Sequence, residues 1–182
     1  MLQRTIKKIM NKKNLNSKIL DSNKSSKINK LKKNNFVIEN DYIMLLGNLN
    51  KTYNLDKKKI VEFLNLLSND KKIKYSASTY NIGIANALLI ALLSCNNIKG
   101  IKVHISSSND IEDLLFYKKF SNYIIFLSEQ NIFDIQKKCN SLKISCLAIG
   151  RVINEKYLII NDGLINLNIN KENGVILTER SI

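Results

Sequence analysis

The 182-residue sequence contains no proline or tryptophan, one histidine and few arginines. The single histidine, His104, lies on the expected outer face of a strand, and no Ser, Cys or carboxylate has a sequence reason to approach it. We therefore interpret it as a solvent-exposed side chain rather than a catalytic base. Of the 29 basic residues, only Arg4, Arg151 and Arg180 are arginine. Sites that bind phosphates or guanine favour arginine, so its scarcity argues against nucleic-acid binding.

The net charge of +14 is concentrated at the N-terminus. Residues 1–40 hold eleven Lys or Arg against two acids, a net charge of +9, and the rest of the chain holds 18 bases against 13 acids. Lys, Asn and Ile are abundant along the whole chain, which indicates compositional drift rather than a selected basic surface. We expect residues 1–35 to be a Lys/Asn/Ser-rich tail and residues 36–182 to form the folded domain. Nucleic-acid binding by the tail is the alternative.

The three cysteines, Cys95, Cys139 and Cys146, have no C-x-x-C spacing. An odd number without that spacing predicts neither a disulfide framework nor a zinc site, so we expect buried, reduced thiols in a cytoplasmic protein. The longest apolar run, Ile82 to Cys95, contains Asn86 and is too short to cross a bilayer of about 30 Å. It predicts a buried helix and no membrane segment.

Apolar blocks of strand length alternate with helical patterns along the chain. Strands are expected at Tyr42 to Gly47, Ile101 to Ile105, Asn122 to Leu127, Ile144 to Ile153, Tyr157 to Ile160 and Leu164 to Ile169. Helices are expected from Asn54 or Asp56 to about Asn69, through the apolar run after Gly83, at Asp110 to Phe116, and from Ser128 to about Asn140. Helical crossovers combined with closing hairpins predict an α+β fold with helices packed on a mixed β-sheet.

Candidate binding residues are few. The stretch from Ser76 to Leu93 contains no Asp, Glu, His, Lys or Arg. The acidic cluster from Asp110 to Asp113 could bind a divalent cation, but it equally suits the first turn of a helix, which we predict instead. The six glycines form no phosphate-binding motif. Gly83 remains, because backbone N–H groups at the start of a helix attract anions. It is the candidate cofactor-binding residue, and we predict no catalytic residue and no metal ligand.

Three blocks of the sequence occur in the order typical of one known family. NDYIMLLGN (40–48) is similar to the motif G-D-x-I-x-L-L-G-E, and KIKYSASTYNIGIANALLIALLS (72–94) is similar to S-A-H-D-x-S-D-G-G-L-A-x-A-L-A-E. LLFYKKFSNYIIFL (114–127) and AIGRVINEKYLIIND (148–162) resemble L-F-G/S-E-x-x-S-R-[FY]-x-V-x-V and the closing I-G-x-V strands. The chain thus resembles, over residues 36–170, the C-terminal domain of the aminoimidazole ribonucleotide (AIR) synthase family. Within that family it most resembles the last domain of phosphoribosylformylglycinamidine (FGAM) synthase, which implies the AIR synthase C-terminal-domain fold.

In the second and third blocks, charged positions of the family motifs are not kept in this sequence. The family's His-Asp pair falls on Ser78 and Thr79, and its second acid falls on Ile82. In the third block its Glu falls on Lys118 and its Arg on Asn122. Ser76, Ala77 and Gly83 match the motif of the second block, and Ser121 matches that of the third. The resemblance therefore implies a ligand-binding loop whose backbone persists without its ionised side chains.

The resemblance implies a C-terminal fragment or split subunit of FGAM synthase that is inactive alone. The complete reaction would be the ATP- and glutamine-dependent amination of formylglycinamide ribonucleotide in purine biosynthesis. ATP and Mg²⁺ would bind in the assembled complex and not to this chain alone, and the partners would be the N-terminal ATP-binding part of the synthase and a glutaminase subunit. The alternatives are another member of the superfamily, of the thiamine-phosphate kinase or selenophosphate synthetase type, a nucleic-acid-binding module, and a decayed pseudoenzyme without a partner.

Overall fold

The computed structural model describes residues 37–47, 57–80, 82–95, 97–105, 115, 122–161, 163–170 and 174–180. The strands are β1 (Tyr42–Leu46), β2 (Tyr75–Ser78), β3 (Gly100–Val103), β4 (Tyr123–Leu127), β5 (Cys146–Ile153), β6 (Tyr157–Ile160), β7 (Gly163–Asn170) and β8 (Gly174–Arg180). The helices are α3 (Lys57–Asn69), α4 (Ile84–Ser94) and α6 (Ile132–Ser141), and the short 3-10 helix η1 (Glu129–Asn131) precedes α6.

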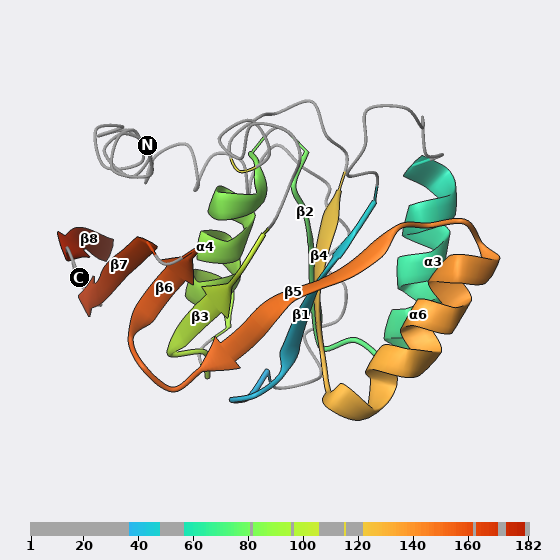
Figure 1. Cartoon of the computed structure of the whole chain (residues 1–182), viewed down its shortest axis with the longest axis horizontal. Coiled ribbons are helices and arrows are strands. Elements are labelled where there is room, and N and C mark those ends of the chain that lie inside the picture. The colour runs from blue at the N-terminus through green and yellow to red at the C-terminus, as the bar shows by residue number, and fades with distance from the viewer. Residues whose placement is uncertain are drawn as a thin grey trace.

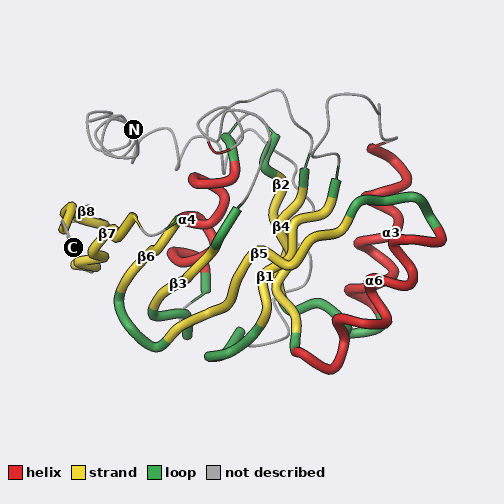
Figure 2. The backbone as a smooth tube through the Cα atoms, in the orientation of Figure 1, coloured by secondary structure: helices red, strands yellow, loops and turns green. Residues whose placement is uncertain are grey.

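The strands form one mixed sheet in the order β2-β4-β1-β5-β3-β6-β7-β8. Among the described strands, β3 and β6 pair in parallel, with Ile101 opposite Leu158, and the other neighbours are antiparallel. Helix α4 lies on one side of the sheet and helices α3 and α6 lie on the other (Figures 1 and 2). The predicted α+β fold, with helices packed on a mixed sheet, is confirmed.

Strands β1 and β4, which are neighbours in the sheet next to the edge strand β2, are buried on both faces. Alternate side chains point to opposite faces of a strand, so each strand contributes to two separate cores. The side chains facing α4 are Ile43, Leu45, Ile124 and Phe126, and those facing α3 and α6 are Met44, Leu46, Ile125 and Leu127. Burying each such side chain fully stabilises the fold by about 1.5–3 kcal/mol. Burial on both sides explains why these strands are continuous apolar runs.

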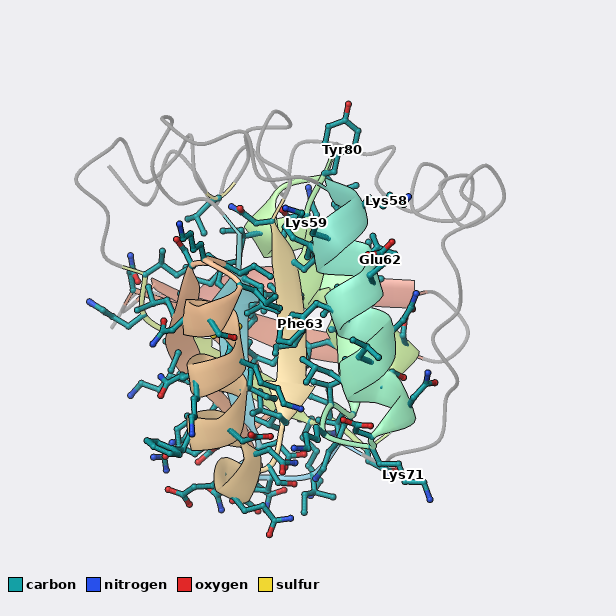
Figure 3. All side chains as sticks on the ribbon, turned by 90° about the vertical axis from the view of Figure 1, so that its right-hand side faces the viewer. Lys58, Lys59, Glu62, Phe63, Lys71 and Tyr80 are labelled. Atoms are coloured by element: carbon teal, nitrogen blue, oxygen red, sulfur yellow. The ribbon has the colours of Figure 1, made fainter. Side chains whose placement is uncertain are left out.

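The helices on the two faces differ in how deeply they are buried. In α3 the apolar side chains recur at helical spacing on one face. Figure 3 shows Phe63 on the side of α3 that faces α6, where it is buried, whereas Lys59 and Glu62 are exposed. Helix α4 instead has buried side chains around almost its whole circumference: Ile84, Ala85, Ala87, Leu88, Leu89, Ala91 and Leu92. An unpaired charge in such surroundings costs several kcal/mol. Burial of α4 therefore explains why residues 84–93 include no charged side chain.

Two strands were missed by the sequence analysis. The segment Tyr75–Ser78 is not among the expected strands, but it is the edge strand β2, paired with β4. It is short and rich in Ser and Ala, so its strand conformation comes from that pairing rather than from propensity. The segment Gly174–Arg180 forms β8 beside β7, where only three closing strands had been expected.

Several other predictions can be compared directly with the structure. The predicted positions of β1, α3, α4, β3, β4, α6, β5, β6 and β7 are confirmed. His104 is exposed to solvent, as expected. The tail of residues 1–35, the loop 106–110 and the helix expected at 110–116 lie outside the described residues, Leu115 excepted. None of the described helices combines the length and the apolar composition needed to cross a membrane.

Candidate functional site

Four residues from distant parts of the chain meet where β1 and β2 end and β4 begins, at the upper end of these strands in Figure 1. We call Gly47, Thr79, Gly83 and Asn122 the edge cluster. The backbone N–H and the hydroxyl of Thr79 both donate to the carbonyl oxygen of Asn122, at 2.8 and 3.0 Å. The N–H of Gly83 donates to the carbonyl oxygen of Thr79 at 2.8 Å. Hydrogen bonds thus join two of the sequence blocks described above, residues 72–94 and residues 114–127.

Gly83 is the N-cap of α4 and has a backbone conformation that needs glycine. Its φ of 81° and ψ of 165° fall in a region that is essentially restricted to glycine. Its carbonyl oxygen accepts the hydrogen bond from Ala87 that starts the helix, and no side chain caps the first turn. Because the N–H of Gly83 already bonds to Thr79, the groups suited to an anion are the N–H groups of the first helical turn. Gly83 therefore shapes the candidate binding site, and its own N–H is already occupied.

Thr79 and Ile82, which align with acids of the motif that the second block resembles, are part of the packing of this chain. Thr79 is buried, and its hydroxyl bonds to Asn122 as described above. Ile82 is partly buried and packs against the core on the α4 side. Neither side chain offers the anionic oxygen that Mg²⁺ prefers, so this set of residues does not fit a magnesium ion.

Asn122 is the unusual member of the edge cluster. Asn122 is 1% exposed, and neither its Nδ2 nor its Oδ1 atom has a hydrogen-bond partner among the residues that the structure describes. Leaving a buried polar group unpaired costs about 1–3 kcal/mol. The amide lies against Gly47, which has a φ of 131°; a Cβ atom built on Gly47 would lie 2.3 Å from Oδ1 of Asn122. Because Gly47 has no Cβ atom, the Asn122 amide can occupy this space.

The sequence analysis found only part of this site. It predicted Gly83 from its place before an apolar helix, and it treated Asn122 as the position of a lost arginine. It missed Gly47 as a site residue, although the glycine at the end of the apolar block 42–46 was a visible signal. Within the described residues, no group of three His, Cys, Asp or Glu side chains is placed to hold a metal ion. The acidic cluster Asp110 to Asp113 lies outside those residues.

The opposite end of the same strands is charged and fully paired. Asp41, just before β1, is buried, and its carboxylate accepts hydrogen bonds from the N–H of Ile38 at 2.7 Å and from Nζ of Lys74 at 2.7 and 2.8 Å. Nearby, the guanidinium of Arg151 lies over the ring of Tyr42, 4.2 Å from its centre. These contacts join the starts of β1 and β2 and leave no unpaired atom of the Asp41 carboxylate.

Comparison with known proteins identifies the fold. No protein-family model matches the sequence, and no curated protein sequence matches it. The structure of phosphoribosylformylglycinamidine synthase II from Thermotoga maritima matches with a TM-score of 0.59 at 12% identity, over 80% of this chain and 26% of that chain. T. maritima PurL complexed with AMPPCP matches with a TM-score of 0.59 at 12% identity, over 83% of this chain and 27% of that chain.

A thiamine-monophosphate kinase from Stenotrophomonas maltophilia matches with a TM-score of 0.48 at 11% identity, over 70% of this chain and 52% of that chain, and this similarity is too low to carry an argument. The chain spans about a quarter of the length of the synthase structures. At sequence identities this low, the structural similarity shows a shared fold and does not show a shared activity. The described part of the chain has the α+β fold of the AIR synthase-like proteins.

Proposed function

We propose that this chain is a C-terminal fragment or split subunit of FGAM synthase, inactive alone, that contributes a structural domain to a multi-chain enzyme. The observation that carries the proposal is the pair of hydrogen bonds from Thr79 to the Asn122 carbonyl oxygen. They join two sequence blocks that resemble FGAM synthase motifs, within a fold that FGAM synthase II shares. The order of the blocks and the contact between them support the same assignment.

The chemistry of the edge cluster supports a subunit without catalytic residues of its own. The cluster combines two glycines, a threonine and an asparagine, and none of these can act as a general acid or base near neutral pH. Its remaining capacity is the set of N–H groups at the start of α4, which suits a phosphate or another anion. In the assembled enzyme the catalytic residues, ATP and Mg²⁺ would belong to the partner chains.

The proposed reaction is the ATP- and glutamine-dependent amination of formylglycinamide ribonucleotide. The proposed partners are a chain with the N-terminal ATP-binding part of the synthase and a glutaminase subunit. The role of this chain would be to complete the scaffold, with the first turn of α4 facing an anionic ligand.

Co-expression and genetic complementation test the proposal together. This chain and a separately encoded N-terminal synthase chain from the same source are expressed, alone and in combination, in a purine-requiring strain that lacks FGAM synthase. We expect growth without purines only when both chains are present, and co-purification of the two. Gly83→Ala should impair complementation because it strains the loop, whereas Lys102→Ala, on the exposed side of β3, should not.

Two outcomes would contradict the proposal. One is an isolated chain that turns over ATP without a partner. The other is failure of the two chains to associate or to support growth when both are folded and abundant, which is the result expected for a decayed pseudoenzyme.

A further inference from the structure

Two cysteines that are seven positions apart in sequence meet in the core between the sheet and helices α3 and α6. Cys139 lies near the end of α6, and Cys146 is the first residue of β5. A tight reversal joins these elements: Lys143 has a positive φ of 58°, and the N–H of Ile144 donates to the carbonyl oxygen of Cys139 at 2.9 Å. The side chains of both cysteines belong to the same core, and the two thiols are close enough for each to change the pKa of the other.

This contact gives the two sulfur atoms different properties. The hydrogen bond from the Cys139 thiol lowers the pKa of Cys146, because it stabilises the Cys146 thiolate. The same contact and burial raise the pKa of Cys139. Cys146 is also partly exposed, whereas Cys139 is buried. Thiolate character and access are what make a cysteine reactive toward oxidants.

The third cysteine lies elsewhere. Cys95 follows α4 and packs against the core on the other face of the sheet, where it interacts electrostatically with Tyr75. The sheet separates it from the other two thiols. Cys95 therefore serves as an internal control thiol in the same protein.

We propose that Cys139 and Cys146 form a reversible disulfide when the protein meets a peroxide. The Cys146 thiolate attacks one peroxide oxygen, so an S–O bond forms, the O–O bond breaks and hydroxide leaves. The Cys139 sulfur then attacks the sulfenic sulfur of Cys146; the S–S bond forms, the S–O bond breaks, and the hydroxide takes up the Cys139 proton to leave as water. Overall two thiols are oxidised and one peroxide is reduced to two waters. This inference does not rest on the proposed synthase role.

The position of the pair links it to the edge cluster. Ser145, next to Cys146, accepts a hydrogen bond through its carbonyl oxygen from the N–H of Gly47 at 2.9 Å. Gly47 in turn carries the Asn122 amide against it. A disulfide would tie the end of α6 to the strand end that supports Gly47. Oxidation is thus expected to act on the edge cluster through one hydrogen bond.

Mass spectrometry of the whole chain tests the proposal. The reduced protein is treated with hydrogen peroxide under native conditions, the remaining thiols are alkylated in denaturant, and the protein is digested with trypsin. We expect a loss of two hydrogen atoms from the intact mass, alkylation at Cys95 alone, and a disulfide joining the peptides CNSLK (139–143) and ISCLAIGR (144–151). Dithiothreitol should restore all three thiols.

Matched variants separate this pair from nonspecific oxidation. Cys95→Ser should form the same disulfide at the wild-type rate. In the Cys139→Ser variant, peroxide should leave a sulfenic acid on Cys146 that dimedone traps. In the Cys146→Ser variant, Cys139 should react neither with peroxide nor, afterwards, with dimedone. The proposal is overturned if the wild-type protein keeps three alkylatable thiols after peroxide, forms its disulfide through Cys95, or forms the 139–146 bond only after unfolding. Peptide mapping of the wild-type protein decides the matter even where a variant fails to fold.

Discussion

The two ends of strands β1, β2 and β4 differ in whether their buried polar side chains are hydrogen-bonded. At one end the Asp41 carboxylate is buried and fully bonded to Lys74 and to the Ile38 N–H. At the other end the Asn122 amide is equally buried and has no hydrogen-bond partner within the described part of the chain. Between the two ends, β1 and β4 are continuous apolar runs, so the difference comes from the residues just outside these strands.

The paired groups around Asp41 stabilise the fold, whereas the unpaired amide of Asn122 destabilises it. Buried polar groups in proteins are almost always hydrogen-bonded, and exceptions concentrate at functional sites. The edge cluster contains such an exception, together with two glycines of positive φ. The far end contains none of these features among Asp41, Lys74 and Ile38. On physical grounds alone, the edge cluster is where a ligand or partner role is to be sought.

The largest effect is expected from breaking the ion pair at the far end. Lys74→Met leaves the Asp41 carboxylate buried without its cation, which costs about 3–5 kcal/mol of unfolding free energy. Urea denaturation followed by circular dichroism measures the loss. The double variant Asp41→Asn/Lys74→Met should recover most of it, because no charge is then left unpaired. A Lys74→Met protein as stable as the wild type would remove the contrast between the two ends.

Tyr75 extends the comparison to a neutral group near the paired end. Its ring packs edge-to-face on Phe126 with centroids 5.5 Å apart, and burial is the main reason its pKa is raised to about 12. An unfolded tyrosine loses its proton near pH 10, so the stabilising contribution is complete below about pH 10. It is lost as the pH rises toward 12, by roughly 2–3 kcal/mol.

Comparison with Tyr75→Phe isolates this effect from the titration of the lysines. The difference in unfolding free energy between the wild type and the variant is measured by urea denaturation at pH 9 and again near pH 11.5. The wild type should lose stability relative to Tyr75→Phe between the two conditions. Parallel curves for the two proteins would show that Tyr75 ionises as freely in the folded chain as in the unfolded one.

An opposite sign is expected at the edge cluster. Asn122→Leu replaces an unpaired buried amide by an apolar side chain of similar size and should stabilise the protein by about 1–3 kcal/mol. The matched control is Asn86→Leu, because the Nδ2 atom of Asn86 donates to the Ile82 carbonyl oxygen at 2.6 Å. That control should not stabilise the protein in the same denaturation assay. If both variants lose stability equally, the Asn122 amide has a partner and the edge cluster is an ordinary structural site.

The sequence predicted most elements of this fold where periodicity was strong. The apolar blocks of β1 and β4 and the helical spacing in α3 are local signals, and they identify the correct elements. Strand β2 gave no such signal, because Tyr75–Ser78 is short and polar and depends on β4 for its hydrogen bonds. Its position at the edge of the sheet could only come from the tertiary structure.

The same distinction applies to the candidate sites. Gly83 was predictable because its role depends on the residues next to it, at the start of α4. The contact of Gly47 with Asn122 joins positions 75 residues apart and depends on the pairing of β1 with β4. Cys139 and Cys146 lie close together because the chain reverses between α6 and β5. Their spacing in the sequence is not C-x-x-C and did not predict this proximity.

The smallest effect is expected from the hydroxyl group of Thr79. Thr79→Val removes one hydrogen bond to the Asn122 carbonyl oxygen but keeps the backbone bond from the Thr79 N–H to the same atom. The acceptor stays satisfied and the side-chain volume is almost unchanged, so the loss should be about 0.5–1.5 kcal/mol in urea denaturation. Thr79→Ser, which keeps the hydroxyl and loses a methyl group, is the control for packing. A loss comparable to that of Lys74→Met would mean that the edge cluster stabilises the fold as strongly as the ion pair, and the two ends of the sheet would then differ in charge alone.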